Sequence, residues 1–416
     1  MTLLPEHVPV AIVGGGQAGL SMSWHLAQRG IEHAVVERSR AFHAWHEERW
    51  DAFTLVTPNF QCRLPGHPYP GDEPEGFMGK LEILAYLDDF LQDLAPPLYE
   101  GVAVTRLGAA PRGFELETTS GTIAADQVVV AVGGYHTPWA PPAAQAGVPA
   151  TIAQLHSNAY RNPESLPEGA VLVVGTGQSG AQIAEDLHLA GRQVHLCVGG
   201  APRCARTYRG RDVVSWLEDM GHYDLAIEDH PEGTAARKEA NHYVTGRDGG
   251  RDLDLRVFAA QGMQLHGLLR AVDGGVATFG DDLRRRLDDA DATYDRINAG
   301  IDRWIAAQGI ETTTGPSVYE PVWQPPAGPP APLNLAAAGI GAVVWCTGFR
   351  PDWSWVDVPF LDETGYPDHQ RGVVAATPGL YVLGLPWLNT WGSGRFAAVA
   401  RDAEHLATQM APVAAR

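Results

Sequence analysis

Two glycine-rich loops of the same pattern are the segments whose residue types and spacing point most directly to chemistry. The stretch Ala11-Ile-Val-Gly-Gly-Gly-Gln-Ala-Gly19 recurs as Leu172-Val-Val-Gly-Thr-Gly-Gln-Ser-Gly180, at a constant offset of 172 − 11 = 161 residues. In a Gly-x-Gly-x-x-Gly loop, the first glycine makes the tight turn from strand to helix and the second lets a pyrophosphate approach the backbone. The third lets the helix pack closely on the strand. The phosphates then lie at a helix N-terminus, where free N–H groups and the dipole favour anions.

One such match is weak evidence in a chain with 47 glycines, because a surface loop can produce it by chance. Two matches, each after a short apolar strand and before an amphipathic helix, predict two dinucleotide sites. The loop residues expected to bind are Gly14, Gly16, Gln17, Ala18 and Gly19 in the first copy and Gly175, Gly177, Gln178, Ser179 and Gly180 in the second.

The two copies differ at the end of the following strand. Glu37 lies 37 − 14 = 23 residues after the first glycine, where a carboxylate can accept both ribose hydroxyls of an adenosine and repel a 2′-phosphate. The equivalent position of the second copy, 175 + 23 = 198, is Val198, and Arg203 and Arg206 follow it. Because arginines bind phosphate well, the first copy is interpreted as an FAD site and the second as an NADPH site. The alternative for these arginines is a solvated basic loop.

Composition excludes several other classes of protein. The chain has 416 residues and a formal net charge of 30 − 49 = −19, whereas proteins that bind nucleic acid or an anionic membrane need basic surface. It has no apolar run of about 18 residues, so no membrane span is expected, and its N-terminus predicts a first strand rather than a signal peptide. The four cysteines form no Cys-x-x-Cys pair, which argues against dithiol and zinc sites and fits a reducing, cytoplasmic location. No metal site is expected.

The elements that position the loops predict an α/β fold with two Rossmann-like dinucleotide-binding domains. Apolar strands expected at 128–132 and 342–346 resemble each other, and 379–384 is expected to return to the first sheet. The FAD domain is therefore predicted to be discontinuous. The predicted domains are 1–150 with 336–416 for FAD, and 151–335 for NADPH, including a partly helical insertion at about 207–335.

Within this insertion, the apolar residues from Leu283 to Trp304 recur at alternating spacings of four and three. This pattern predicts one amphipathic helix of about 25 residues. The favoured interpretation is packing on its own domain. The alternative is a lid or a dimer seam. A dimer seam would make the chain a homodimer.

Taken together, these motifs resemble those of the class B flavin-dependent monooxygenases, which include the flavin-containing monooxygenases, N-hydroxylases, YUCCA enzymes and Baeyer–Villiger enzymes. The resemblance covers nearly the whole chain. Besides the glycine loops and Glu37, it rests on Trp45-His-Glu-Glu-Arg-Trp50, Leu55-Val-Thr-Pro58, His156-Ser-Asn-Ala-Tyr160 and Thr347-Gly-Phe-Arg-Pro351. The linker motif is incomplete, because Ala150 and Ile152 stand where a full Baeyer–Villiger motif has Phe and Gly.

This resemblance implies a mechanism and a class of substrate. NADPH would reduce FAD, reduced flavin would react with O2 to give a C4a-hydroperoxide, and one oxygen atom would pass to a small nucleophilic substrate while NADP⁺ stays bound. The chain is most similar to a bacterial subgroup encoded beside nitrilases, which suggests a nitrogen-containing substrate. The alternatives are a flavoprotein reductase or oxidase, or a redox sensor that holds FAD and NADP(H) without turnover.

The resemblance also implies roles for individual residues. Asn59 is expected at the junction of flavin and NADP⁺, with a turn after Pro58 as the alternative. Arg395 is expected to face the flavin pyrimidine or an anionic substrate, with a surface ion pair to Asp402 or Glu404 as the alternative. Trp387 and Trp391 are expected to wall the substrate pocket, with a packing role, the default for tryptophans, as the alternative. The other residues expected at the cofactors are Arg38, Trp45, His46, Arg49, Thr57, Val102, Val104, Ala131, Gly133 and Gly384 for FAD, and His156, Tyr160, Thr347 and Gly348 near NADPH.

Overall fold

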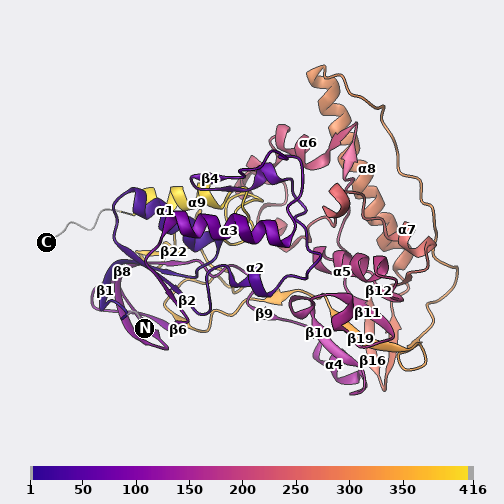
Figure 1. Ribbon diagram of the computed structural model, residues 1–416, viewed down its shortest axis with the longest axis horizontal. Helices are drawn as coiled ribbons and strands as arrows, with labels where there is room; N and C mark the ends of the chain where they lie inside the picture. Colours follow the sequence, from indigo (N-terminus) through magenta and orange to yellow (C-terminus); the bar gives the residue numbers. More distant parts are fainter. Residues whose placement is uncertain (1–2, 411–416) are drawn as a thin grey trace.

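The computed structural model describes residues 3–410 and has two lobes, each built around its own sheet (Figure 1). Residues 1, 2 and 411–416 of the predicted FAD domain lie outside the described part. In the first lobe the sheet has the order β21-β6-β7-β8-β1-β2-β5, and β22 pairs with β8. Its elements are β1 (His7–Val13), β2 (His33–Glu37), β5 (Leu98–Glu100), β6 (Val104–Ala109), β7 (Phe114–Thr118), β8 (Gly121–Val130), β21 (Val356–Asp357) and β22 (Leu380–Val382), with helices α1 (Gln17–Gln28), α3 (Lys80–Leu94) and α9 (Val399–Gln409).

Alternation of side chains along β1 explains why this sheet is buried on both faces. Val10 and Ile12 belong to a core shared with α1, α3 and α9, whereas Ala11 and Val13 belong to a second core on the opposite face. Strands buried on both faces are continuous apolar runs, as β1 is from Val8 to Val13 and as β8 is over its last three residues, 128–130. Because β22 pairs in parallel with β8, the C-terminal part of the chain returns to the first sheet, as the predicted fold class requires.

The second lobe repeats this arrangement around the second glycine loop. Its sheet has the order β10-β19-β11-β12-β15, and all of its strand pairs are parallel. The elements are β10 (Ala153–His156), β11 (Ala170–Val174), β12 (Val194–Cys197), β15 (Gln264–His266) and β19 (Ile340–Trp345), with helix α5 (Gln178–Leu189) after β11. Since β19 pairs with β10 and β11, the FAD-domain segment predicted as 336–416 begins too early, and the chain returns to the first lobe only after β19. The lobes are joined where β9 (Thr137–Pro138) pairs antiparallel with β20 (Phe349–Arg350), so the two crossings of the chain form one ribbon.

An insertion of helices and short strands extends the second lobe. It includes β16 (Leu269–Asp273), β17 (Val276–Phe279), β18 (Leu333–Asn334), α6 (Val213–Asp219), α7 (Leu255–Ala260) and α8 (Leu283–Gln308). The long helix α8 runs along the outer side of this lobe in Figure 1. Its residues Ile301 and Ile305 are buried in a core with Trp216 of α6, and Trp304 packs against the same core. The apolar stripe therefore packs on its own domain, and the lid or dimer seam is not what this stripe forms.

No helix among residues 3–410 is long and apolar enough to cross a membrane. Within the same range, no group of three or more His, Cys, Asp or Glu side chains is arranged to hold a metal ion.

Candidate cofactor and active site

The first glycine loop has the geometry that a bound pyrophosphate requires. Gly14 has a φ of +115°, and a Cβ on it would lie 2.6 Å from the Ala131 carbonyl oxygen. A Cβ on Gly19 would lie 1.9 Å from the carbonyl oxygen of Gly14, so the third glycine is needed for α1 to pack on the turn. A Cβ on Gly16 would meet no atom within 4 Å. The second glycine thus faces the open space that the phosphates would fill.

In the second loop the same three positions have the same three environments. Gly175 has a φ of +105° and its Cβ would lie 2.6 Å from the Cys346 carbonyl oxygen. A Cβ on Gly180 would lie 1.9 Å from the Gly175 carbonyl oxygen, whereas one on Gly177 would meet nothing within 4 Å. In both loops the space beside the second glycine is free of protein atoms, as a bound dinucleotide requires.

The strand ends beside the two loops differ in chemistry. Glu37 at the end of β2 accepts hydrogen bonds from the backbone N–H groups of Gly15 and Ser39, each at 2.8 Å. These bonds fix its carboxylate at the end of the strand, where an adenosine ribose would lie. In the second loop the Thr176 hydroxyl accepts a hydrogen bond from Gly199 N–H at 2.9 Å. No acid of the second loop occupies the place of Glu37.

The Gln17 side chain connects the first loop to the residues expected along the flavin. Its amide donates to the Gly394 carbonyl at 3.3 Å, and its carbonyl oxygen accepts from the indole N–H of Trp45 at 3.2 Å. The Trp45 ring stacks on Phe396 with centroids 5.1 Å apart, and the Arg49 guanidinium lies 4.9 Å from the Trp45 centroid. Trp45 and Arg49 are thus gathered at the N-terminus of α1, together with the loop that carries Arg395.

Arg395 is a half-buried cation at this place. It donates to the Trp391 carbonyl and, at 2.9 Å, to the side-chain oxygen of Asn241, and its guanidinium lies 3.8 Å from the Trp391 ring centroid. Burial lowers the pKa of both Arg395 and Arg49, and both lie within electrostatic reach of Tyr135. Within residues 3–410 neither arginine has a carboxylate partner. The alternative of a surface ion pair to Asp402 or Glu404 is therefore wrong.

Asn59 does not have the contacts expected of a catalytic residue. It is buried, its amide donates to the Glu73 carbonyl at 3.0 Å, and its oxygen accepts from Met78 N–H at 2.7 Å. With both ends of the amide bound within the 59–78 loop, Asn59 stabilises this loop. The catalytic role expected for it is corrected to the structural alternative.

Arg203 and Arg206 are also corrected. Each side chain is only 2% exposed. Arg203 pairs with Asp254 at 3.3 Å and Asp291 at 2.8 Å, and Arg206 pairs with Asp212 at 2.7 Å. Since both guanidinium groups are enclosed and neutralised inside the lobe, they form neither a 2′-phosphate site nor a solvated basic loop.

The remaining predicted cofactor residues fall into two groups. Next to the first loop lie Gly384, whose Cβ would be 2.5 Å from the Cβ of Ala18, and Val102, whose N–H donates to the Glu37 carbonyl at 2.9 Å. Gly133 faces open space, Val104 begins β6, Thr57 is half-buried, Arg38 is exposed, and His46 lies 3.3 Å from Asp88 of α3.

At the ribbon between the lobes lie His156, Tyr160, Thr347 and Gly348. His156 bonds to the Gly348 carbonyl at 2.9 Å, and the Thr347 hydroxyl donates to the Trp139 carbonyl at 2.5 Å. The buried Tyr160 hydroxyl donates to Asp186 of α5 at 2.7 Å. His156 and Trp139 are thus joined to the segment after β19, whereas Tyr160 joins the segment after β10 to α5.

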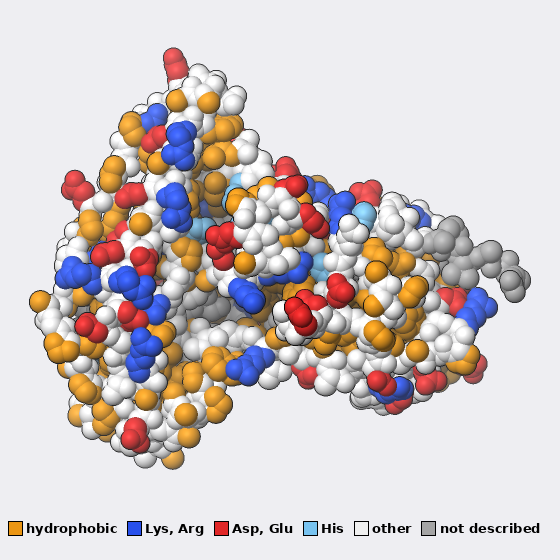
Figure 2. All heavy atoms as spheres, turned by 180° about the vertical axis from the view of Figure 1, so that it is seen from behind, with side chains coloured by type: hydrophobic (Ala, Val, Ile, Leu, Met, Phe, Trp, Pro, Cys, Tyr) orange, Lys and Arg blue, Asp and Glu red, His pale blue; other side chains and the backbone are white. Residues whose placement is uncertain are grey.

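Two residues of this region had no distinguishing signal in the sequence. Tyr135 follows β8 and its ring lies 5.6 Å from that of Phe349, which follows β19. Asn241 lies in the insertion, yet it holds both Arg395 and the indole N–H of Trp391, the latter at 3.2 Å. Figure 2 shows the hollow between the two lobes, with Lys or Arg side chains at its edge.

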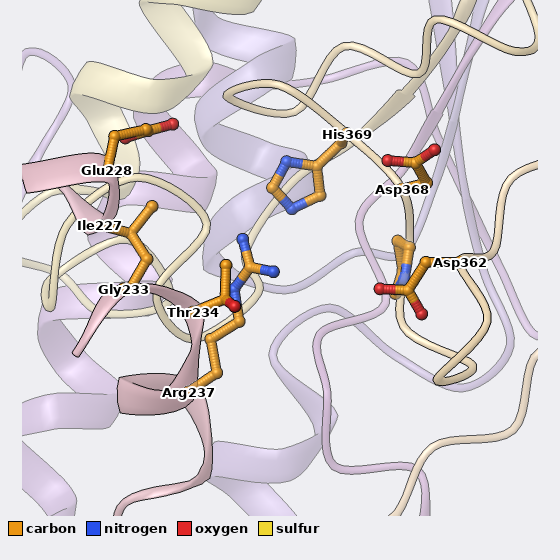
Figure 3. Close-up of a pocket in the computed structure, with 9 residues that line it drawn as sticks. Ile227, Glu228, Gly233, Thr234, Arg237, Asp362, Asp368 and His369 are labelled. Carbon is orange, nitrogen blue, oxygen red and sulfur yellow. The ribbon is translucent and has the colours of Figure 1, made fainter. Parts of the chain in front are cut away.

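A cavity lies where the insertion meets the C-terminal part of the first lobe. It is lined by Arg237 and His369, among others, and the Arg237 side chain points toward the His369 ring (Figure 3). Arg237 lies 4.3 Å from the Tyr366 ring centroid and donates to the Trp387 carbonyl at 3.4 Å. Trp387 has a φ of +54°, which is unusual for a bulky side chain. The insertion thus supports the loop of Trp387 and Trp391 from outside.

Comparisons with known proteins agree with this geometry. Residues 11–265 match the family model described as pyridine nucleotide-disulphide oxidoreductase. An oxidoreductase of Geobacillus kaustophilus named CzcO-like is 30% identical over 402 residues, covering 96% of this chain and 97% of that protein. A probable indole-3-pyruvate monooxygenase of Arabidopsis thaliana, YUCCA1, is 30% identical over 198 residues, 46% of this chain and 47% of its own. A flavin-containing monooxygenase structure from Stenotrophomonas maltophilia has a TM-score of 0.66 at 19% identity and covers 98% of both chains.

Fold, loops and comparisons together define a two-domain flavoprotein oxidoreductase. Within the pyridine nucleotide-disulphide oxidoreductases, the chain belongs to the class B flavin-dependent monooxygenase family. It is an enzyme that depends on FAD and NADPH.

Proposed function

We propose that this enzyme transfers one oxygen atom from a flavin C4a-hydroperoxide to a small nucleophilic substrate, with nitrogen-containing compounds as the first class to test. The observation that carries the proposal is the meeting of the two sheets at their carboxyl ends. Tyr135 follows β8 of the first sheet, Phe349 follows β19 of the second, and their rings lie 5.6 Å apart. Ligands of open α/β sheets bind outside these strand ends, so the reactive parts of both cofactors would converge here.

The chain's own residues would bind, orient and exclude water. Glu37 would hold the FAD ribose, and the residues held by Gln17 would lie along the flavin. Arg49 and Arg395, which have no carboxylate partner within the described residues, would face anionic groups, either the flavin pyrimidine or an anionic part of the substrate. Asn241 orients Arg395, and Trp387 and Trp391 would wall the pocket against water.

The cysteines weigh against the alternative of a disulfide reductase. Cys62, Cys197 and Cys204 are buried, Cys346 is half-buried, and all four are free. Burial raises the pKa of Cys62 and of Cys204 to about 12, so these thiols carry little thiolate at neutral pH. Four free, protonated thiols also support a location in a reducing, cytoplasmic compartment.

Rapid mixing tests the proposal directly. The purified yellow protein is reduced anaerobically with NADPH and then mixed with oxygenated buffer without substrate. We expect a transient peroxyflavin absorbance band before reoxidation, whose decay is accelerated by the true substrate class among amines, thioethers and ketones. Direct return to oxidised flavin would favour an oxidase or reductase. Failure of NADPH to reduce the flavin would leave only a redox sensor.

A further inference from the structure

An arginine cluster at the start of α8 carries more positive charge than its partners neutralise. Asp282 is paired with Arg286 at 2.9 Å, Arg270 at 3.5 Å and Arg285 at 4.0 Å, and its side chain is 10% exposed. One further carboxylate, Asp289, lies 3.1 Å from Arg285, but both of these side chains are about two-thirds exposed. The Arg270 and Arg285 side chains are 56% and 64% exposed, so Arg286 and Asp282 form the enclosed pair, and the cluster as a whole has three guanidinium groups against two carboxylates. Such a surplus favours an anionic ligand.

Arg286 has binding capacity on the side that faces Gly200. Its side chain is 14% exposed, and its Nε–H is buried without a hydrogen-bond partner among the described residues. Because this Nε–H is enclosed by protein and Nη2 is paired with Asp282, a ligand reaches Arg286 through Nη1, the nitrogen that lies beside Gly200. The guanidinium fork matches the geometry of a phosphate.

The cluster lies beside the strand end that distinguishes the two dinucleotide sites. Gly200 stands two positions after Val198, at the place that Ser39 occupies beside Glu37 in the first copy, since 39 + 161 = 200. A Cβ on Gly200 would lie 3.5 Å from Nη1 of Arg286. A groove at this place is lined by Gly200, Pro202, Arg285, Arg286, Asp289 and Thr293, among others. In a dinucleotide-binding domain, the 2′ position of the adenosine ribose lies at this end of the second strand.

We infer that Arg286, assisted by Arg285, binds the 2′-phosphate of NADPH, so that the inserted helix α8 selects NADPH over NADH. Asp282 holds the Arg286 side chain, while the exposed Arg270 and Arg285 leave the cluster with one more cation than carboxylate. The first domain has Glu37 where it must accept ribose hydroxyls, whereas the second has open glycines and a cation supplied by the insertion. This assignment replaces Arg203 and Arg206, which are enclosed in internal ion pairs.

The test uses the full-length holoenzyme and measures anaerobic flavin reduction at varied NADPH and, separately, at varied NADH. For Arg286→Met we expect the Kd for NADPH to rise about 10- to 100-fold and that for NADH to change less than about twofold. Arg285→Met should have a smaller effect because its side chain is exposed. Arg284→Met is the matched control, since the Arg284 side chain is bound to Gln324 and Pro325. It should leave both constants unchanged.

Equilibrium binding of adenosine 2′-monophosphate and adenosine 5′-monophosphate gives a readout that is independent of turnover. Arg286→Met should weaken binding of the 2′-phosphate only. If this variant does not fold, Gly200→Glu places a carboxylate opposite Arg286 and should likewise weaken NADPH but not NADH. An unchanged preference between NADPH and NADH in a folded, yellow Arg286→Met protein would overturn the inference. Because reduction by NADPH in the wild type is measured in the same series, this result is distinguishable from failure of the monooxygenase proposal.

Discussion

The two glycine loops have the same backbone and packing but different neighbours at the strand end. In the first loop, a Cβ on Gly15 would lie 2.9 Å from the Glu37 Cβ, so the carboxylate requires a glycine there. In the second loop, the equivalent residue is Thr176, which has room because Gly199 has no side chain beside it. The backbone pattern is therefore common to both loops, and the proposed difference in dinucleotide rests on the side chains at the strand ends. Gly15 and Glu37 of the first loop correspond to Thr176 and Val198 of the second, so both members of this pair differ between the two loops.

Substitution of the third glycine of each loop should have the largest effect on dinucleotide binding. In Gly19→Ala the new Cβ would lie 1.9 Å from the Gly14 carbonyl oxygen, so α1 must shift away from the turn. We expect protein that does not retain FAD, measured by flavin absorbance after gel filtration. The same contact in the second loop makes Gly180→Ala the matched variant. It should stay yellow but no longer be reduced by NADPH; a colourless Gly180→Ala protein would show that the loops do not act separately.

Glu37→Ala tests the strand end of the first loop. It removes the proposed ribose acceptor and leaves the N–H groups of Gly15 and Ser39 without their partner. We expect the Kd of the apoprotein for FAD to rise about 10- to 100-fold, measured by quenching of flavin fluorescence.

Glu100→Ala is the control for Glu37→Ala, because Glu100 accepts a backbone hydrogen bond from Ala41 N–H at 2.6 Å on the neighbouring strand end. It should cost stability with less effect on FAD affinity. An equal loss of FAD affinity in both variants would mean that Glu37 acts only on the fold.

The local parts of this comparison were predictable from the sequence, and the long-range parts were not. Glycine spacing and strand–helix order are encoded in short segments, so both loops follow from them; the return of β22 to the first sheet is a long-range pairing that the apolar run at 379–384 and the resemblance together predicted. Arg203 was misassigned because its partner Asp291 lies 88 residues away in the sequence. Asn241 was missed because it lies 154 residues from Arg395. Arg286 belongs to a helix that begins far beyond the loop it approaches, and only the folded insertion brings them together.

The second glycine should affect the ligand alone. A Cβ on Gly177 meets no protein atom within 4 Å, so Gly177→Ala should leave the thermal unfolding temperature of the protein unchanged. Since the added methyl group lies where the phosphates approach, we expect the Kd for NADPH to rise about tenfold. Gly16→Ala is the counterpart and should weaken FAD without changing NADPH binding to the yellow fraction. A large drop in unfolding temperature would show that protein, not ligand, occupies this space.

The smallest expected effect concerns the edge strand next to β2 in the first sheet and next to β12 in the second. Its last residues include Glu100 in β5 and His266 in β15. Burial, and to a lesser extent the charge of His195, lowers the pKa of His266 to about 4. Between these two pKa values, His266 is protonated in the unfolded chain, where its pKa is about 6.5, and neutral in the folded protein. The free energy of unfolding should therefore fall as pH decreases from about 6.5 to about 4, and this contribution should be fully present above that window.

For His266 the expected loss is on the order of 1 kcal/mol between pH 7 and pH 5. His266→Gln removes the titrating group but keeps a polar partner for His195, which bonds to His266 at 3.0 Å. Urea unfolding at both pH values, followed by tryptophan fluorescence, measures the difference. The variant should lose less stability than the wild type on acidification, because it no longer has a proton to take up on unfolding at this strand end. Equal losses would place the acid sensitivity elsewhere and remove this distinction between the two sheets.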